Sequence, residues 1–375
     1  MLVNKLKVSL AAGLIAAGLT GVAVSSGSAL ASSQSCDTAT SAAACGGMTA
    51  LIKAAQKEGR LNVITLPSNW ANYGNIIKDF SKKYGIHVDS YNPEGSSAQE
   101  IEAVQQDKGR SNAPDVLDVG TSFAVDNMGL LAPYKVATWN EIPTALKNAK
   151  GYWYDDYGGY MAIGCDTAKV TTCPTSFKDL LNPEYKGEVG INNDPTEASA
   201  AFSAVFAAAL ANGGSFSNIQ PGINFFAQLN KEGNFVPGAS GESTAASGAT
   251  PILIWWDYLQ ASEIEPEIST WKVVIPSDAS YAAYYTQAIS KTAPDPAAAR
   301  LWEEYLYSVV GQNLWLEGEA RPVELAALIQ NGTVNKAADA KLPPAPAGVT
   351  TYPTLTQLTA AEAVVDANWA SDVSG

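Results

Sequence analysis

The sequence contains a single histidine, His87, among 375 residues. Ser-His-Asp and Cys-His catalysis and most zinc sites require histidine, so the sequence disfavours these chemistries. It also lacks the Gly-x-Ser-x-Gly nucleophile pattern, the phosphate-binding P-loop and the glycine pattern of dinucleotide-binding folds. His87 lies inside a predicted strand, where we interpret it as a surface or structural residue. A secreted hydrolase that uses two carboxylates stays open as an alternative, because 37 acidic residues can supply them.

Basic residues are also few. The sequence has 23 Lys and Arg against 37 Asp and Glu, which gives a formal net charge of −14. The first 31 residues hold two of the lysines and no acid, so the remainder is more negative still. This charge argues against nucleic acid as a partner. An acidic surface also serves solubility, so it does not by itself identify a cationic ligand.

Long apolar runs are limited to one, near the N-terminus. Lys5 and Lys7 precede an uncharged stretch at residues 8–24, and a small-residue pattern ends it at Ala31. This order is typical of a secretory signal peptide, and we predict cleavage after Ala31. Because no second run of about 18 apolar residues follows, we expect the cleaved protein to be soluble and extracytoplasmic, in the periplasm or at the cell surface.

Cysteine is limited to four residues, which suits an oxidising compartment. The cysteines form two close pairs in the sequence, Cys36 with Cys45 and Cys165 with Cys173. Local pairing is the simplest of the possible connectivities. Neither pair has the Cys-x-x-Cys spacing of a zinc or redox motif, so we interpret the cysteines as structural disulfides.

Helical and strand-like patterns alternate along the chain. In the first third, the predicted helices are 48–58, 76–84 and 98–106, and the predicted strands are 61–65, 86–91 and 116–119. Further on, the predicted strands are 158–164, 188–192, 252–256 and 273–276, and the predicted helices are 198–211, 223–230, 296–316 and 355–370. The proline-rich residues 341–352 are predicted to be extended. This alternation predicts an α/β fold with parallel strands, and the length favours two domains.

Residues 176–187, Ser-Phe-Lys-Asp-Leu-Leu-Asn-Pro-Glu-Tyr-Lys-Gly, resemble a segment of a family of extracellular solute-binding proteins. That family includes spermidine/putrescine-, ferric-iron- and organophosphonate-binding members. The resemblance extends to residues 54–61, to residues 113–116 and to the helix after Asp295. It implies the two-lobed type II fold of periplasmic binding proteins, in which each lobe is a mostly parallel sheet flanked by helices and hinge strands join the lobes. It also implies a non-catalytic protein without a cofactor, which captures a small solute for the membrane permease of an ABC importer.

From this resemblance we predict the domain boundaries. Lobe 1 is expected at residues 48–154 and 289–323, and lobe 2 at residues 155–288 and 324–375. An N-terminal segment, residues 32–47, would carry the first disulfide. We expect the protein to be a monomer.

The polyamine-binding members supply the most specific match to a binding site. They carry a Trp and a Tyr three residues apart in their first loop, and Trp70 and Tyr73 have that spacing. The resemblance also implies a hydroxyl and an aromatic ligand contact from Thr121 and Phe123. Aromatic faces attract cations, which suits an amine. Trp70 and Tyr73 equally suit ordinary packing on a helix face.

An Asp-x-x-Glu pair that binds an ammonium group in these members matches Asp194 and Glu197. Carboxylates accept charge-assisted hydrogen bonds from such a group. The same residues are also what a helix starting at Pro195 requires, as the N-cap aspartate and the N3 glutamate. Ligand binding and helix capping therefore both stay open for Asp194.

The strand end at Trp255, Trp256 and Asp257 supplies further candidates, because polyamine binders place a Trp there. The ferric-binding members instead carry adjacent tyrosines, whose phenolate oxygens suit iron. The tryptophans of this chain therefore disfavour iron.

Two departures weaken the amine interpretation. A later Trp-x-Asp of the polyamine binders falls on a segment that contains Tyr284 and Tyr285, and one of their tyrosines is replaced by Arg321. An arginine in the cleft would favour a carboxylate or phosphonate group. An organophosphonate or another anionic or zwitterionic solute is therefore the alternative ligand. The candidates for that alternative are Ser96, Ser97 and Arg321.

Overall fold

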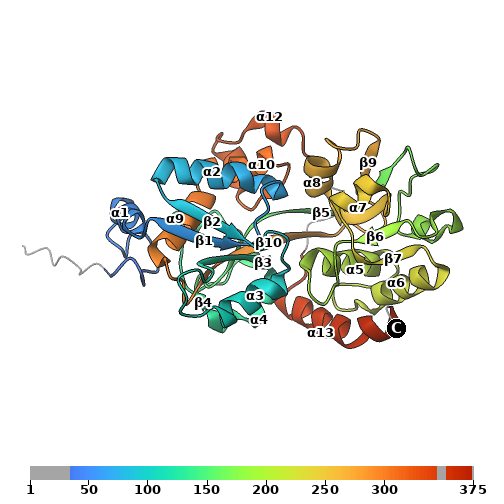
Figure 1. Cartoon of the computed structure of the whole chain (residues 1–375), viewed down its shortest axis with the longest axis horizontal. Helices are drawn as coiled ribbons and strands as arrows, with labels where there is room; N and C mark the ends of the chain where they lie inside the picture. The colour runs from blue at the N-terminus through green and yellow to red at the C-terminus, as the bar shows by residue number, and fades with distance from the viewer. Residues whose placement is uncertain (1–33, 344–351, 374–375) are drawn as a thin grey trace, which may run out of the picture. The chain divides into compact units, whose positions relative to one another are not determined.

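The computed structural model describes residues 34–343 and 352–373 (Figure 1). The predicted signal peptide and most of the proline-rich stretch 341–352 lie outside these residues. None of the described helices combines the length and the apolar character that crossing a membrane would need.

The strands form two sheets. In the smaller sheet, β1 (Arg60–Ile64) pairs in parallel with β2 (His87–Tyr91). The larger sheet has the strand order β3-β10-β5-β8-β6-β7, with β4 and β11 at its first half and β9 at its second. Its strands are β3 (Val116–Gly120), β4 (Leu131–Ala132), β5 (Tyr154–Asp166), β6 (Val189–Ile191), β7 (Phe235–Ala239), β8 (Ile252–Trp256), β9 (Trp271–Val274), β10 (Ala282–Ser290) and β11 (Arg321–Pro322).

Strand β5 belongs to both halves of the larger sheet. Its first half pairs with β10, and its second half, from Met161 onward, pairs with β8 and β9. Figure 1 shows β5 between β1, β2 and β3 on one side and β6 and β7 on the other. All residues of β5 are buried, as expected for a strand covered on both faces. The strand predicted at 158–164 is therefore confirmed as part of β5.

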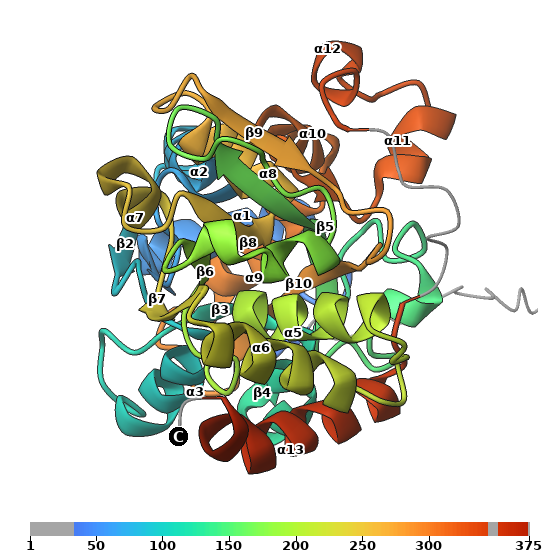
Figure 2. The same cartoon turned by 90° about the vertical axis from the view of Figure 1, so that its right-hand side faces the viewer.

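Helices lie at the positions that the sequence predicts, except that the helix predicted at 296–316 is interrupted, and the short helices α4, α7, α8, α11 and α12 were not predicted. The helices are α1 (Met48–Glu58), α2 (Tyr73–Tyr84), α3 (Ser97–Gln106), α4 (Thr121–Asp126), α5 (Ser199–Ala211), α6 (Gln220–Glu232), α7 (Glu242–Ser247), α8 (Asp257–Leu259), α9 (Pro296–Leu306), α10 (Val309–Glu317), α11 (Leu325–Gln330), α12 (Lys336–Asp339) and α13 (Leu355–Asp372). Helices α5, α6 and α13 lie side by side, as Figure 2 shows. Helix α13 also contacts α4, which follows β3.

The prediction of one helix over residues 296–316 is wrong. The chain forms α9 and α10 instead, with a break at Tyr307 and Ser308. The Ser308 hydroxyl accepts a hydrogen bond from the Gly311 N–H at 3.2 Å, so Ser308 is the N-cap of a new helix. The apolar pattern continues across this break, which is why the pattern alone did not reveal it.

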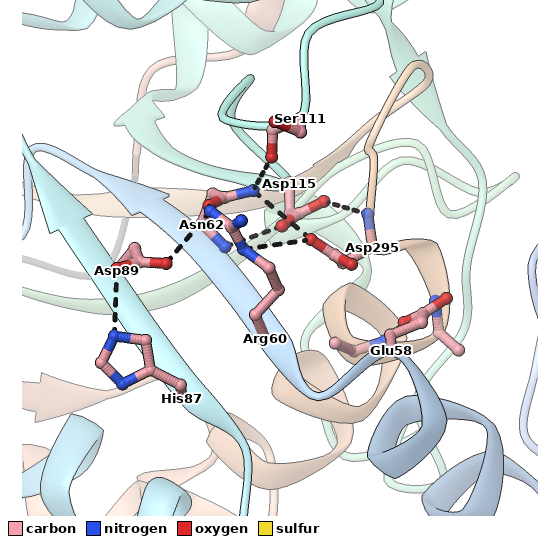
Figure 3. A network of polar contacts seen from close by, with 10 residues as sticks. Glu58, Arg60, Asn62, His87, Asp89, Ser111, Asp115 and Asp295 are labelled. Carbon is pink, nitrogen blue, oxygen red and sulfur yellow. Dashed lines mark hydrogen bonds and ion pairs between the residues drawn. The ribbon is translucent and has the colours of Figure 1, made fainter.

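A polar network joins β1, β2 and the loop before α9 (Figure 3). The Asp115 carboxylate accepts hydrogen bonds from the backbone N–H groups of Asn62 and Asp295, each at 2.7 Å. On the surface of β2, His87 Nε2 lies 3.1 Å from Asp89 Oδ1, and the His87 side chain is largely exposed. His87 is therefore a surface strand residue, as predicted.

Both local cysteine pairs are disulfides. Cys36 is bonded to Cys45, and Cys165, near the end of β5, is bonded to Cys173. The predicted connectivity is confirmed, and each bond closes a short loop.

Candidate functional site

A cavity of about 450 Å³ lies beyond the carboxyl ends of the parallel strands. One wall comes from the segments that follow β1 and β2, together with α3 and β3. The other comes from the segments that follow β6 and β7, together with β8 and the π-helical turn Gln260–Ile264. This is the position where open α/β sheets bind ligands, and the volume suits a small molecule.

The side chains of the cavity lining that can be charged near neutral pH are carboxyl groups. Five carboxyl groups contribute, and within residues 34–343 and 352–373 no lysine, arginine or histidine lines the cavity. The five acids are Glu94, Glu100, Asp118, Glu242 and Glu263. Such a lining favours a cation and disfavours an anion.

Asp118, on β3, is held by two hydrogen bonds from other side chains. Its Oδ2 accepts hydrogen bonds from the hydroxyls of Tyr73 at 2.6 Å and Tyr157 at 2.9 Å. Burial raises the pKa of the Asp118 carboxyl to about 7, although the two phenol hydrogen bonds oppose the rise. The carboxyl is therefore poised to gain or lose a proton near neutral pH.

Glu100 lies behind Asp118, on α3. Its Oε2 accepts a hydrogen bond from the Asp118 backbone N–H at 2.9 Å, and the side chain is completely buried. Burial, with the nearby Asp118 charge, holds the pKa of Glu100 well above its usual range. Two buried carboxyl groups thus share one region of the wall, and neither has a basic partner among the described residues.

Glu263 contributes an acid from the opposite wall. It is buried in the π-helical turn, and burial raises its pKa to about 8, with smaller contributions from the charges of Glu242 and Glu94. Turns of this kind often occur at functional sites. The cavity is therefore acidic on both sides.

Three aromatic side chains lie together in the lining. The Trp70 ring lies edge-on to Trp255 at 5.9 Å and to Tyr285 at 5.8 Å between ring centroids. The Trp70 indole N–H donates a hydrogen bond to the Tyr157 hydroxyl at 2.7 Å, which connects this cluster to Asp118. Aromatic rings beside carboxylates are a suitable environment for an organic cation.

A strained turn positions Trp70. Ala71 and Asn72 have φ angles of 44° and 71°, a left-handed conformation that is costly for residues with a Cβ. The Asn72 side-chain amide donates a hydrogen bond to the Leu314 carbonyl at 2.8 Å, which holds the turn against α10.

The two walls contact each other at the rim of the cavity. The Ala98 N–H donates a hydrogen bond to the Glu197 carbonyl at 3.4 Å, and the Asn69 side chain donates one to Glu242 Oε2 at 3.4 Å. Where β3 ends, Gly120 approaches Ser199 so closely that a Cβ on Gly120 would clash with it. The structure therefore represents a form in which the walls meet.

Five of the residues predicted from the sequence line this cavity. They are Trp70, Ser96, Ser97, Trp255 and Tyr285. The Ser96 hydroxyl also caps α3 by accepting a hydrogen bond from the Gln99 N–H, and the Ser97 hydroxyl accepts one from the Gly120 N–H at 3.1 Å. Both hydroxyls therefore serve the fold as well as the cavity.

The other predicted residues lie elsewhere. Tyr73 and Trp256 are buried beside the cavity wall, and Tyr73 reaches it only through Asp118. Thr121 and Tyr284 line a separate cavity of about 50 Å³, which is too small for a metabolite. Phe123 packs in a hydrophobic cluster with residues of α3 and β3.

Arg321 and Asp257 form an ion pair outside the lining. Arg321 Nη1 lies 2.8 Å from Asp257 Oδ2, both side chains are mostly buried, and the guanidinium lies over the Tyr160 ring at 4.5 Å. Arg321 is therefore engaged within the protein, and the structure does not bring it together with Ser96 and Ser97.

Asp194 is not the cap of a helix that starts at Pro195. Helix α5 begins at Ser199, and Ala198 is its N-cap residue. The Asp194 carboxylate instead accepts hydrogen bonds from the N–H and the hydroxyl of Thr196 at 2.8 and 2.7 Å. Glu197 is exposed, and neither acid lines the cavity. This local turn occupies the place where a helix starting at Pro195 would have its first residues.

The sequence interpretation missed Glu100, Asp118 and Glu263. For Asp118 a sequence signal existed, because an aspartate interrupts the otherwise apolar strand 116–119. Buried carboxyls are rare without a partner, so an acid in such a strand indicates a site. In the described part of the chain, no group of three or more His, Cys, Asp or Glu side chains is arranged to hold a metal ion.

Comparison with known proteins places the chain in a family. No curated protein matches the sequence. The family model for bacterial extracellular solute-binding proteins matches residues 114–346.

Three solved structures illustrate the likeness in fold. The periplasmic binding protein AfuA from Actinobacillus pleuropneumoniae, bound to fructose-6-phosphate, is 19% identical over 84% of this chain and 99% of its own, with a TM-score of 0.68. A putative spermidine/putrescine ABC transporter protein from Listeria monocytogenes is 14% identical over 75% and 88%, with a TM-score of 0.59. The ferric ion-binding protein A of Pasteurella haemolytica is 18% identical over 82% and 97%, also with a TM-score of 0.59. The predicted fold class is confirmed.

Proposed function

Because the chain belongs to the family of bacterial extracellular solute-binding proteins, we propose that its cavity captures a small solute that carries a protonated amine, such as a polyamine. The protein acts as the solute-binding component of an ABC transporter and passes the solute to a membrane permease. The observation that carries the proposal is the lining, which has five acids, three aromatic rings and, among the described residues, no basic side chain. A desolvated ammonium group needs such carboxylates and ring faces.

Closure of two lobes over the solute is part of this proposal. The long strand β5, shared by the two halves of the sheet, would act as a hinge strand. The hydrogen bonds from Ala98 to Glu197 and from Asn69 to Glu242 would form on closure and break on release.

A zwitterionic solute is the second candidate. Helices α3 and α5 both begin at the cavity, and helix N-termini favour negative groups. The Trp255 indole N–H is buried and has no hydrogen-bond partner among the described residues, so it is available to an acceptor on the solute. These observations favour an amine that also carries an acceptor group, and they do not involve Arg321.

A thermal-shift screen tests the proposal. The purified protein is heated with putrescine, spermidine, ornithine, succinate, fructose-6-phosphate or ferric citrate. We expect a rise in the unfolding midpoint with at least one amine, because a ligand that binds only the folded state stabilises it. Stabilisation by succinate or fructose-6-phosphate alone would overturn the amine assignment. Turnover of a glycoside in a separate hydrolysis assay would instead support the hydrolase alternative.

A further inference from the structure

Asp118 is a buried acid without a counter-charge in the part of the chain that the structure describes. Its side chain is 5% exposed, it lines the cavity, and its Oδ1 has no hydrogen-bond partner among the described residues. The neighbouring Glu100 is fully buried, and its Oε1 likewise lacks a partner there. Leaving such atoms unpaired is costly, so native proteins seldom do so without a functional reason.

Among residues 34–343 and 352–373, no cationic side chain compensates Asp118. Helices α2, α3 and α8 and strands β5 and β10 all place titratable groups near it, and each group is an acid or a phenol. These groups are Tyr73, Glu100, Asp156, Tyr157, Tyr258 and Tyr285, and Glu303 of α9 adds a further acid. None of the described residues therefore supplies a positive charge to Asp118, and a bound solute could supply it.

This inference rests on the proposed function and deepens it. We propose that Asp118, and not Asp194, is the specificity-determining counter-ion for the ammonium group of the solute, and that binding releases a proton from Asp118 or Glu100. In the empty cavity the pair of carboxyl groups holds at least one proton. When the ammonium group enters, a carboxyl O–H bond breaks, the proton passes to solvent, and the resulting carboxylate pairs with the ammonium.

The electrostatics of the site agree with this exchange. Burial raises the pKa of Asp118 to about 7 and that of Glu100 well above its usual range. A cation next to a carboxyl group favours the ionised form and lowers its pKa. Alkyl amines stay protonated up to about pH 10, as the lysine side chain does, so the protein and not the ligand titrates between pH 5.5 and 7.5.

Tyr73 and Tyr157 are positioning residues in this scheme. Their hydroxyls hold Oδ2 of Asp118, at 2.6 and 2.9 Å, and leave Oδ1 for the solute. Because both phenols stabilise the ionised form, loss of either hydroxyl should raise the pH at which binding becomes strong.

Calorimetry with putrescine on the unmodified protein tests proton release directly. Titrations at pH 6.5 in two buffers of different ionisation enthalpy should give different observed enthalpies, equivalent to roughly half a proton or more released per solute. Affinity should rise on the order of tenfold from pH 5.5 to 7.5. Equal enthalpies in both buffers and a flat affinity profile would overturn the inference.

Substitutions test whether Asp118 is the carboxyl group that binds the ammonium group and takes part in the proton release. Asp118→Asn should weaken putrescine binding at least about tenfold and reduce the proton release to less than half. Tyr157→Phe should shift the midpoint of the pH profile upward and approach wild-type affinity at high pH. The matched control is Glu102→Gln, an exposed acid on the same helix as Glu100, which should change neither quantity. Wild-type binding by Asp118→Asn would contradict the assignment, and if that variant fails to fold, the calorimetry on the unmodified protein decides.

The two proposals fail in different ways. If no amine binds the unmodified protein, the proposed function and this inference fall together. If an amine binds without proton release and independently of Asp118, only this inference falls.

Discussion

Asp118 and Asp257 are both buried aspartates, but they have different hydrogen-bond and ion-pair partners. Asp257 is 2% exposed, and it receives the Arg321 guanidinium at 2.8 Å and the Tyr160 backbone N–H at 2.8 Å. Asp118 is 5% exposed and receives two phenol hydroxyls. Burial raises the pKa of both carboxyls, but a neighbouring cation opposes the rise only at Asp257.

The difference separates a buried acid that has a structural role from one that is suited to binding a ligand. Asp257 has its counter-ion within the chain, so its pair with Arg321 is complete without a ligand. Asp118 lines the cavity and has hydrogen-bond donors that orient it but do not neutralise it. A buried acid that is held in place but left without a counter-charge is suited to a cation from solution.

The largest effect that separates the two aspartates is expected from Arg321→Ala. Removing the guanidinium leaves Asp257 as an uncompensated buried charge, which should cost about 3 to 5 kcal/mol of unfolding free energy. Denaturant unfolding measures the loss, and Arg321→Lys should retain part of the stability. Putrescine affinity of the folded fraction should stay unchanged, because Arg321 lies outside the cavity lining. A large loss of affinity at equal stability would place Arg321 in the binding site after all.

The dependence of stability on pH should come from buried carboxyl groups whose pKa is raised, as it is at Asp118. Burial raises the pKa of Asp118 and Asp155 to about 7, and those of Glu303 and Glu324 to about 8. Because these values lie above the unfolded values near 4, the folded state holds protons more tightly, and stability is lost progressively as pH rises from about 4 to about 7 to 8. The thermal midpoint should fall by roughly 5 °C or more between pH 5 and pH 8. Asp118→Asn should flatten this fall more than Asp257→Asn does, because the Arg321 guanidinium opposes the rise in pKa at Asp257.

A smaller effect is expected from Trp70→Phe. The change removes the indole N–H that binds the Tyr157 hydroxyl and replaces the ring with one that attracts cations less strongly. Putrescine affinity should fall by about 1 kcal/mol, which is about fivefold, with little change in stability. Calorimetry measures the affinity, and Trp139→Phe, outside the cavity, is the control. An unchanged affinity would mean that Trp70 packs in the cavity wall and does not contribute to binding the solute.

The smallest effect is expected from Asp194→Asn. The side chain of Asp194 accepts hydrogen bonds from Thr196 and does not line the cavity. Putrescine affinity should change by less than about 0.5 kcal/mol, in contrast to Asp118→Asn. A loss comparable to that of Asp118→Asn would restore Asp194 as the ammonium ligand.

Much of the fold could be predicted because hydrophobic periodicity and turn residues are local. The helices before Gly59 and Gly85, both at a left-handed φ, end where the sequence indicates. The break at Ser308 was missed because a capping serine competes with a continuing apolar pattern. The helix predicted at 198–211 is confirmed as α5, and only the start at Pro195 considered for Asp194 is wrong, because the Asp194 side chain closes a turn with Thr196.

The site was predicted less well, for a physical reason. Trp70 and Trp255 could be identified because their motif spacing is local in sequence. The pairing of Arg321 with Asp257 joins residues 64 positions apart, and Tyr73 meets Asp118 across 45 positions. Tertiary contacts of this range decide which charges remain free for a ligand, and no spacing rule reveals them.

The most direct test of the central claim uses three ligands of similar length that differ in charge: putrescine, 1,4-butanediol and succinate. Isothermal titration at pH 7.5 measures the affinity of the unmodified protein for each. The acidic lining, which has no basic side chain among the described residues, predicts that putrescine binds and that the neutral and anionic analogues bind at least about a hundredfold more weakly. Binding of succinate as tight as that of putrescine would contradict the assignment of the cavity to an amine.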